Sequence, residues 1–253
     1  DEEIGAAVCH FDTGKNGNGL YVNCIFKAYH TAVHLGASDT TIQNCTVYGD
    51  VESGADLENL LVAYSTVKGV GAIRYEKLHN SVILFSEAEN ILVKNSTNAY
   101  VCENAIYGSL FVDNVRYFLA EDNILCTAAP VLVAVRDYNG DSVTDVTARE
   151  EYGVNEDLLP HVNYDAFVGM ARKQTVRTLD RATSVIGDYI SENLKSNTDL
   201  VVAPGAYSGG SLTRIKLEDV ENANLYAYGV LFERSSNFAG YFLDIVDCKY
   251  VSF

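Results

Sequence analysis

The sequence predicts an all-β protein built as a solenoid, in which short strands stack turn upon turn. Three observations favour this fold. Strand-like apolar runs recur along the first half of the chain, Asn-Cys pairs at 23–24 and 44–45 lie 21 residues apart, and few Asn-Gly or Asp-Gly hairpin signals separate the runs. A period slightly above 20 residues is typical of a solenoid, whose turns bury their faces only by stacking. An antiparallel sandwich, whose strands also recur at short spacing, is the alternative.

The repeated runs share one local pattern. Residues 20–26 read LYVNCIF, residues 41–47 read TIQNCTV, and a further step reaches LLVAYSTV. Later runs at 88–97 and 120–129 continue the pattern at wider spacing. Alternation within each run points one set of side chains inward and the other outward. An Asn before the apolar run tolerates a left-handed bend, and its amide is expected to bond to the equivalent residue of the next turn.

Changes of pattern divide the chain into three portions. Residues 1–136 carry solenoid turns, residues 137–179 form an acidic linker or insertion, and residues 180–253 begin a second β-helical portion. The last portion opens with a short capping helix near 180–195, for which Asp180 is the expected N-cap. The apolar residues at helical spacing on one face of this helix are Ala182, Val185, Ile186, Tyr189, Ile190 and Leu194.

The helix is followed by LVVAPGAYSG at 200–209 and by IKLEDVENANLYAYGVLFE at 215–233. This order resembles the amino-terminal part of right-handed parallel β-helix proteins of the pectate-lyase-like superfamily, in which an amphipathic helix plugs the first turn. Residues 17–136 resemble interior turns of the same architecture. The resemblance implies a right-handed parallel β-helix, and it is much less specific for function than for fold.

The order of the portions is unusual, because interior-type turns come before a first-turn motif and Phe253 falls within a strand-like run. Two explanations fit. The sequence is a window from a longer protein with tandem β-helices, which we favour, or its exposed end is covered by residues 1–26 of another copy. The second explanation predicts a homo-oligomer assembled by end-to-end stacking, since an open strand edge needs a cover.

Charge and cysteine content narrow the classes of function. The chain has 34 acidic and 18 basic residues, a formal net charge of −16, which argues against nucleic acid as a partner. Apolar runs stay well short of the roughly 18 residues of a membrane span, so membrane insertion is not expected. The six cysteines are widely spaced and lack zinc-site spacing, so we interpret them as small buried residues, with a disulfide left open.

A calcium site is predicted at residues 137–145, which read DYNGDSVTD. Oxygen-bearing side chains occupy positions 1, 3, 5 and 9 of this loop, as in calcium loops of dockerin modules and FG-GAP repeats, which it resembles. The expected ligands are Asp137, Asn139, Asp141 and Asp145. Position 6 is Ser142 where Gly is expected, so a solvated acidic turn without metal is the alternative.

Candidate catalytic residues gather in KAYHTAVHLGASD at 27–39, which holds Lys27, His30, His34 and Asp39. An outward His or Lys is a suitable base on a β-helix face, where the sugar cleft of enzymes with this fold runs. In lyases of this fold an Arg or Lys abstracts the proton beside a uronate, and Arg74 is the candidate for that role. A solvated face or a salt-bridged strand is the competing interpretation for each residue.

Glycosidase chemistry instead needs two carboxylates a few ångströms apart. The candidates on successive turns are Asp39, Asp50, Glu52, Asp56 and Glu58. Together with the resemblance, these residues lead us to expect a secreted carbohydrate-active protein, located outside the cell or at its surface. It would hydrolyse or eliminate a polysaccharide bound along the outer groove. The alternative is a non-enzymatic structural or adhesive solenoid.

Overall fold

The computed structural model describes residues 8–11, 19–54, 56–125, 146–149, 186–208, 214–233 and 241–253. The chain divides into two compact units, Asp1–Gly169 and Met170–Phe253, which are described separately as unit 1 and unit 2. All strand pairs of the described residues are parallel, so the antiparallel sandwich is excluded there. The prediction of an all-β solenoid with a short helix is confirmed.

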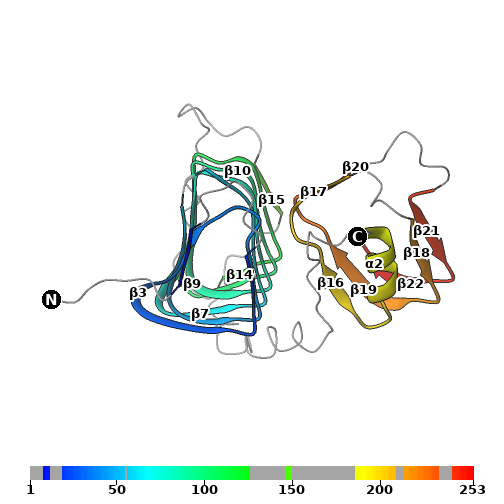
Figure 1. Ribbon diagram of the computed structural model, residues 1–253, viewed down its shortest axis with the longest axis horizontal. Helices are drawn as coiled ribbons and strands as arrows, with labels where there is room; N and C mark the ends of the chain where they lie inside the picture. The colour runs from blue at the N-terminus through cyan, green and yellow to red at the C-terminus, as the bar shows by residue number, and fades with distance from the viewer. Residues whose placement is uncertain are drawn as a thin grey trace. The chain divides into compact units, whose positions relative to one another are not determined.

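Unit 1 winds between two parallel sheets, and its successive turns lie one behind another in Figure 1. Sheet A consists of β1 (Val8–Phe11), β3 (Ile25–Gly36), β5 (Thr46–Ser53), β7 (Thr66–Glu76), β9 (Glu87–Lys94), β11 (Ala105–Ile106) and β14 (Ile124–Leu125), with β12 (Leu110–Asp113) also paired to β9. Sheet B consists of β2 (Leu20–Val22), β4 (Thr41–Gln43), β6 (Leu57–Ala63), β8 (Leu78–Leu84), β10 (Thr97–Cys102), β13 (Arg116–Glu121) and β15 (Val146–Arg149).

Strand β15 falls within the range that the sequence predicts as an acidic linker, and it pairs in parallel with β13. The remaining residues of 137–179 lie outside the described part of the chain.

Turns of the coil are made by residues in the left-handed backbone region. Asn23, Asn44 and Asn95 have φ of 58°, 51° and 50°, and many other corner positions hold Asn or Asp. These side chains tolerate the left-handed conformation because they are short and polar. Asn44 donates from Nδ2 to Oδ1 of Asn23 on the preceding turn, and Asn114 donates to Asn95 in the same way at 2.7 Å. The expected role of asparagine at the bends is therefore confirmed.

A second ladder runs inside the corners that follow six strands of sheet B, namely β2, β4, β6, β8, β10 and β13. Its members are Cys24, Cys45, Ser65, Ser86, Asn104 and Asn123. The backbone N–H of each of the first five members donates to the side chain of the next, at 3.2 Å from Cys45 to Ser65 Oγ and 2.9 Å from Ser86 to Asn104 Oδ1. Buried backbone donors at the corner are thus satisfied by the neighbouring turn, which also fixes the stacking register.

The interior of unit 1 is filled by aliphatic side chains that repeat from turn to turn. Val33, Val51, Ile73 and Ile91 occupy the same register position on four strands of sheet A, and each is fully buried. The residues that directly follow them, His34, Glu52, Arg74 and Leu92, are half-buried or exposed, as expected where side chains alternate along a strand. This alternation places the outward residues of sheet A in columns that run along the stack.

Unit 2 contains a short helix and a second set of parallel strands. Helix α2 (Ile186–Asn193) buries Ile186 and Ile190 in a cluster that also holds Ile215 and Leu217. The strands pair as β16 (Asp199–Val201), β19 (Glu221–Tyr226) and β22 (Lys249–Ser252), then β17 (Gly205–Ser208) with β20 (Val230–Glu233), and β18 (Ile215–Glu218) with β21 (Leu243–Val246). The expected cap Asp180 lies outside the described residues.

Cys24, Cys45, Cys102 and Cys248 are free thiols, of which Cys45 and Cys102 are buried. In the described part of the chain, no helix is long and apolar enough to cross a membrane.

Candidate functional site

Three of the five candidate catalytic residues lie on one strand, β3. Lys27 and His30 are exposed on it and His34 is half-buried. Arg74 lies on β7, and Asp39 lies in the corner between β3 and β4. The alignment of residues between neighbouring strands therefore shows which of these side chains are close enough to act together.

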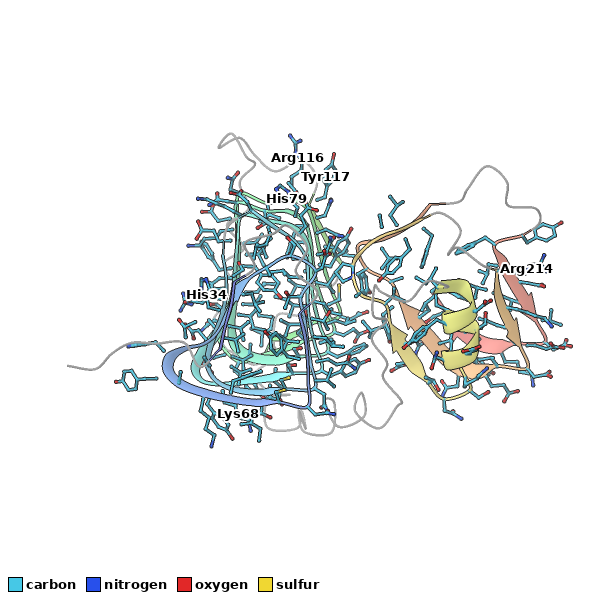
Figure 2. The ribbon with its side chains drawn as sticks, in the orientation of Figure 1. His34, Lys68, His79, Arg116, Tyr117 and Arg214 are labelled. Carbon is cyan, nitrogen blue, oxygen red and sulfur yellow. The ribbon has the colours of Figure 1, made fainter. Side chains whose placement is uncertain are left out.

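His34 and Arg74 share one outward column of sheet A. The Cα of His34 is registered with that of Glu52 on β5, and Glu52 is registered with Arg74 on β7. Neighbouring parallel strands are about 4.8 Å apart, so Glu52 lies directly between the two predicted residues. Figure 2 shows His34 on the outside of unit 1, where this column faces solvent.

Arg74 joins two carboxylates in this column, at Asp50 and Glu52. Its Nε lies 3.0 Å from Oδ2 of Asp50 and 3.7 Å from Oε1 of Glu52. Asp50 also accepts from the backbone N–H of Ala72 at 2.8 Å, and Oε2 of Glu52 accepts from the hydroxyl of Thr31 at 3.0 Å. Each carboxylate is thus fixed by two contacts. We call Thr31, His34, Asp50, Glu52 and Arg74 the carboxylate cluster.

The degree of exposure differs within the cluster. The side chain of Asp50 is 17% exposed, that of Glu52 is 34% exposed and that of Arg74 is 46% exposed. Partly exposed ion pairs contribute little to stability, typically about 0–1 kcal/mol. The ion pairs of Arg74 with Asp50 and Glu52 are therefore expected to add little to the stability of the fold.

Asp39 has a structural position in a further ladder, which joins it to Asn59 and Asn80. Its φ is 59°, and its Oδ1 accepts from Nδ2 of Asn59 at 2.9 Å. Asn59 in turn accepts from Asn80 at 2.8 Å, so Asp39 begins a ladder across three turns. This contact accounts for the residue type at position 39 without a catalytic role.

Lys27 and His30 make aromatic contacts of their own. Nζ of Lys27 lies 4.8 Å from the ring centre of Tyr48, and Tyr48 is registered with Lys68 on the next strand. His30 meets the ring of Tyr29 edge to face at 4.6 Å between ring centres. The register of β3 against β5 shifts between Lys27 and Thr31, which separates Lys27 from the carboxylate cluster along the strand. Figure 2 shows Lys68 on a different side of unit 1 from His34.

The described part of the chain contains no group of side chains that is arranged as a metal centre. Among those residues, no group of three or more His, Cys, Asp or Glu side chains is arranged to hold a metal ion, and this includes the carboxylate cluster. The predicted calcium ligands Asp137, Asn139, Asp141 and Asp145 lie outside the described residues. Calcium at that loop stays a prediction.

Asp50 and Glu52 are among the five carboxylates that the sequence offers for glycosidase chemistry, but residue type alone does not distinguish them from the other three. The members of the column are separated by 18 residues from His34 to Glu52 and by 22 residues from Glu52 to Arg74. Such unequal turn lengths conceal the column in a search for a constant repeat. The available signal was the spacing of Asp50 and Glu52, since residues two apart on a strand share one face.

Comparison with known proteins assigns no family to the chain. No family model matches it, and neither the curated proteins nor the solved structures give a match. The class of protein is therefore defined by the fold alone, as a parallel β-solenoid, and its function has to be inferred from the residues on its outer faces.

Proposed function

We propose that unit 1 is a polysaccharide hydrolase that binds a glycan along the outer face of β3, β5 and β7. The observation that carries the proposal is the pair Asp50 and Glu52, two outward carboxylates that contact the same guanidinium at 3.0 and 3.7 Å. Glycoside hydrolysis needs such a pair on opposite sides of the bond that breaks. The open, elongated face of a stacked sheet suits a chain-like substrate.

The contacts of the two carboxylates suggest different roles. Asp50 is the more buried and accepts hydrogen bonds from Ala72 N–H and from Arg74, which suits an anion that stabilises positive charge on the sugar ring. Glu52 is the more exposed of the two, so a bound glycan can reach its carboxyl group, and the proposal assigns to it the transfer of a proton to the leaving oxygen.

Arg74 fits a binding role better than that of a base. A guanidinium remains protonated in proteins, so it cannot take up the proton that a base removes. The hydrolase is therefore better supported than a lyase in which Arg74 removes a proton. In this proposal the protein acts outside the cell or at its surface, where polysaccharides are found.

The test is incubation with a panel of plant and microbial polysaccharides, with and without calcium, following reducing ends and ultraviolet absorbance. We expect new reducing ends without unsaturated products, and a loss of at least about 100-fold in Glu52→Gln and Asp50→Asn. Asp122→Asn is the matched control, because Asp122 is an exposed corner residue at φ 53°, where Asn is tolerated.

Other outcomes select between the alternatives. Unsaturated products would indicate a lyase and would direct attention to Lys27 or Arg74 as the base. No cleavage across a broad panel would reject the enzyme and favour the structural or adhesive solenoid. Cleavage that persists in both carboxylate variants would place the active site elsewhere.

A further inference from the structure

A second outward column, on sheet B, contains a histidine, a threonine and two charged residues in consecutive turns. Its four members are Glu58, His79, Thr97 and Arg116, each registered with the next. Each of them directly precedes a residue with left-handed backbone, namely Asn59, Asn80, Asn98 and Tyr117. The four side chains therefore project from equivalent backbone positions. We call them the Thr97 column.

His79 and Thr97 are in hydrogen-bond contact, with 2.8 Å between Nδ1 and Oγ1. In the tautomer that carries its proton on Nε2, the ring accepts from the threonine hydroxyl, as a general base does with a nucleophile. Thr97 is half-buried, whereas His79 and Arg116 are exposed, so a ligand in solvent can reach the hydroxyl. Figure 2 shows His79, Arg116 and Tyr117 close together on a different side of unit 1 from His34.

The backbone beside Thr97 is held by a buried neighbour. The Ser96 hydroxyl accepts from the N–H of Leu78 at 3.1 Å and donates to the carbonyl of Lys94 at 2.7 Å. The N–H of Arg116 donates to the Ser96 carbonyl at 2.9 Å. Three neighbouring turns are therefore locked together at this position, which fixes the spacing of His79, Thr97 and Arg116. Fixed geometry of this kind is what a nucleophile and its base require.

Arg116 supplies positive charge next to the threonine. Within the described residues the structure records no ion pair for Arg116, although the chain as a whole carries a charge of −16. A guanidinium directly beside a nucleophile is placed to stabilise negative charge that forms on a carbonyl oxygen. On the other side of His79, Glu58 of β6 is the registered residue, but within the described residues no hydrogen bond or ion pair joins its carboxylate to the imidazole.

From this arrangement we infer a second activity for unit 1, the hydrolysis of carboxylate esters with Thr97 as the nucleophile. The Thr97 hydroxyl attacks the ester carbonyl carbon while its proton passes to Nδ1 of His79, and Arg116 stabilises the oxyanion. The C–O bond to the alcohol then breaks, and the alcohol leaves with the proton from His79. Water, deprotonated by His79, attacks the acyl-threonine, releasing the carboxylic acid and restoring the hydroxyl.

This inference is independent of the proposed glycan hydrolysis. The Thr97 column lies on β6, β8, β10 and β13 of sheet B, whereas the carboxylate cluster lies on β3, β5 and β7 of sheet A. Failure of one activity therefore leaves the other untouched, and each has its own variants and its own assay.

The experiment uses the full chain with p-nitrophenyl acetate, following nitrophenolate release above the buffer rate and the mass of the protein. We expect an increase of one acetyl group, located on Thr97 by peptide mapping. Thr97→Val and His79→Gln should each lower the rate by about 100-fold or more, while Thr97→Ser retains activity. Thr46→Val is the matched control, because Thr46 is a half-exposed threonine on sheet A.

Circular dichroism of each variant separates loss of activity from loss of fold. Hydrolysis that is unchanged in Thr97→Val, acetyl groups found only on other side chains, or a rate no greater than that of buffer would each overturn the inference.

Discussion

The hydroxyl group of Tyr75 gives the sharpest test of how unit 1 is stabilised. Tyr75 lies on β7 with 1% of its surface exposed, and its hydroxyl has no hydrogen-bond partner among the described residues. A buried, unsatisfied polar group costs about 1–3 kcal/mol. Tyr75→Phe removes that group and keeps the ring in place, so we expect unit 1 to gain about 1–2 kcal/mol in free energy of unfolding.

Thermal unfolding followed by circular dichroism measures this gain. For a unit of this length, 1 kcal/mol corresponds to about 2–4 °C, so Tm should rise by about 2–8 °C in Tyr75→Phe. Burial raises the pKa of Tyr75 well above its ordinary value of 10.0. Above about pH 10 the unfolded state loses this proton and the folded state keeps it, which destabilises the wild type. The advantage of Tyr75→Phe should therefore widen above pH 10.

Tyr107→Phe is the control for this prediction. The Tyr107 hydroxyl donates to Oε1 of Glu87 at 3.1 Å, so its removal breaks a hydrogen bond to a buried carboxylate. We expect Tyr107→Phe to lower the free energy of unfolding by about 1 kcal/mol and therefore to lower Tm. A fall in Tm for Tyr75→Phe, or an advantage that stays constant above pH 10, would refute the reasoning.

Three further predictions concern the corners and unit 2. Asn104→Ala should cost about 2–4 kcal/mol in denaturant unfolding, because it strands the buried N–H of Ser86 that donates to Asn104 at 2.9 Å; a loss below 1 kcal/mol would contradict the ladder. Gly49→Ala should cost about 2–4 kcal/mol, since φ is 125° and a Cβ would lie 2.5 Å from the carbonyl oxygen of His30; an unchanged Tm would disprove the close approach. Burial raises the pKa of Asp199, because it disfavours the charged carboxylate. The protonated carboxyl group therefore contributes fully to the stability of unit 2 below about pH 3.8, and this contribution is lost as the pH rises through the pKa of the folded state. Asp199→Asn should therefore stabilise unit 2 at pH 7 and leave it unchanged near pH 3, as compared by thermal melts at the two values.

The solenoid could be predicted because its signals are local. The Asn-Cys pairs at 23–24 and 44–45 occupy corners whose left-handed backbone is well tolerated by asparagine, and the apolar runs after them alternate as parallel strands require. The helix at 186–193 was also predictable, because its buried residues Ile186 and Ile190 recur at helical spacing.

The candidate site was only partly predictable. His34 and Arg74 were selected by residue type, and the structure brings both to Glu52. Asp39 was selected in the same way, yet it belongs to a corner ladder through Asn59. The contact between His79 and Thr97 could not be predicted, because a histidine and a threonine 18 residues apart give no local sign of it.

The sequence by itself determined the class of fold, because strand alternation, corner residues and helical spacing depend on near neighbours in the chain. Only the tertiary structure decided which outward side chains meet. Partners in a column belong to different turns, and turns of unequal length with register shifts, such as that between Lys27 and Thr31, change which residues are aligned. The contacts of Arg74 with Asp50 and of His79 with Thr97 follow from that alignment, which is set by the buried columns and ladders of the whole stack.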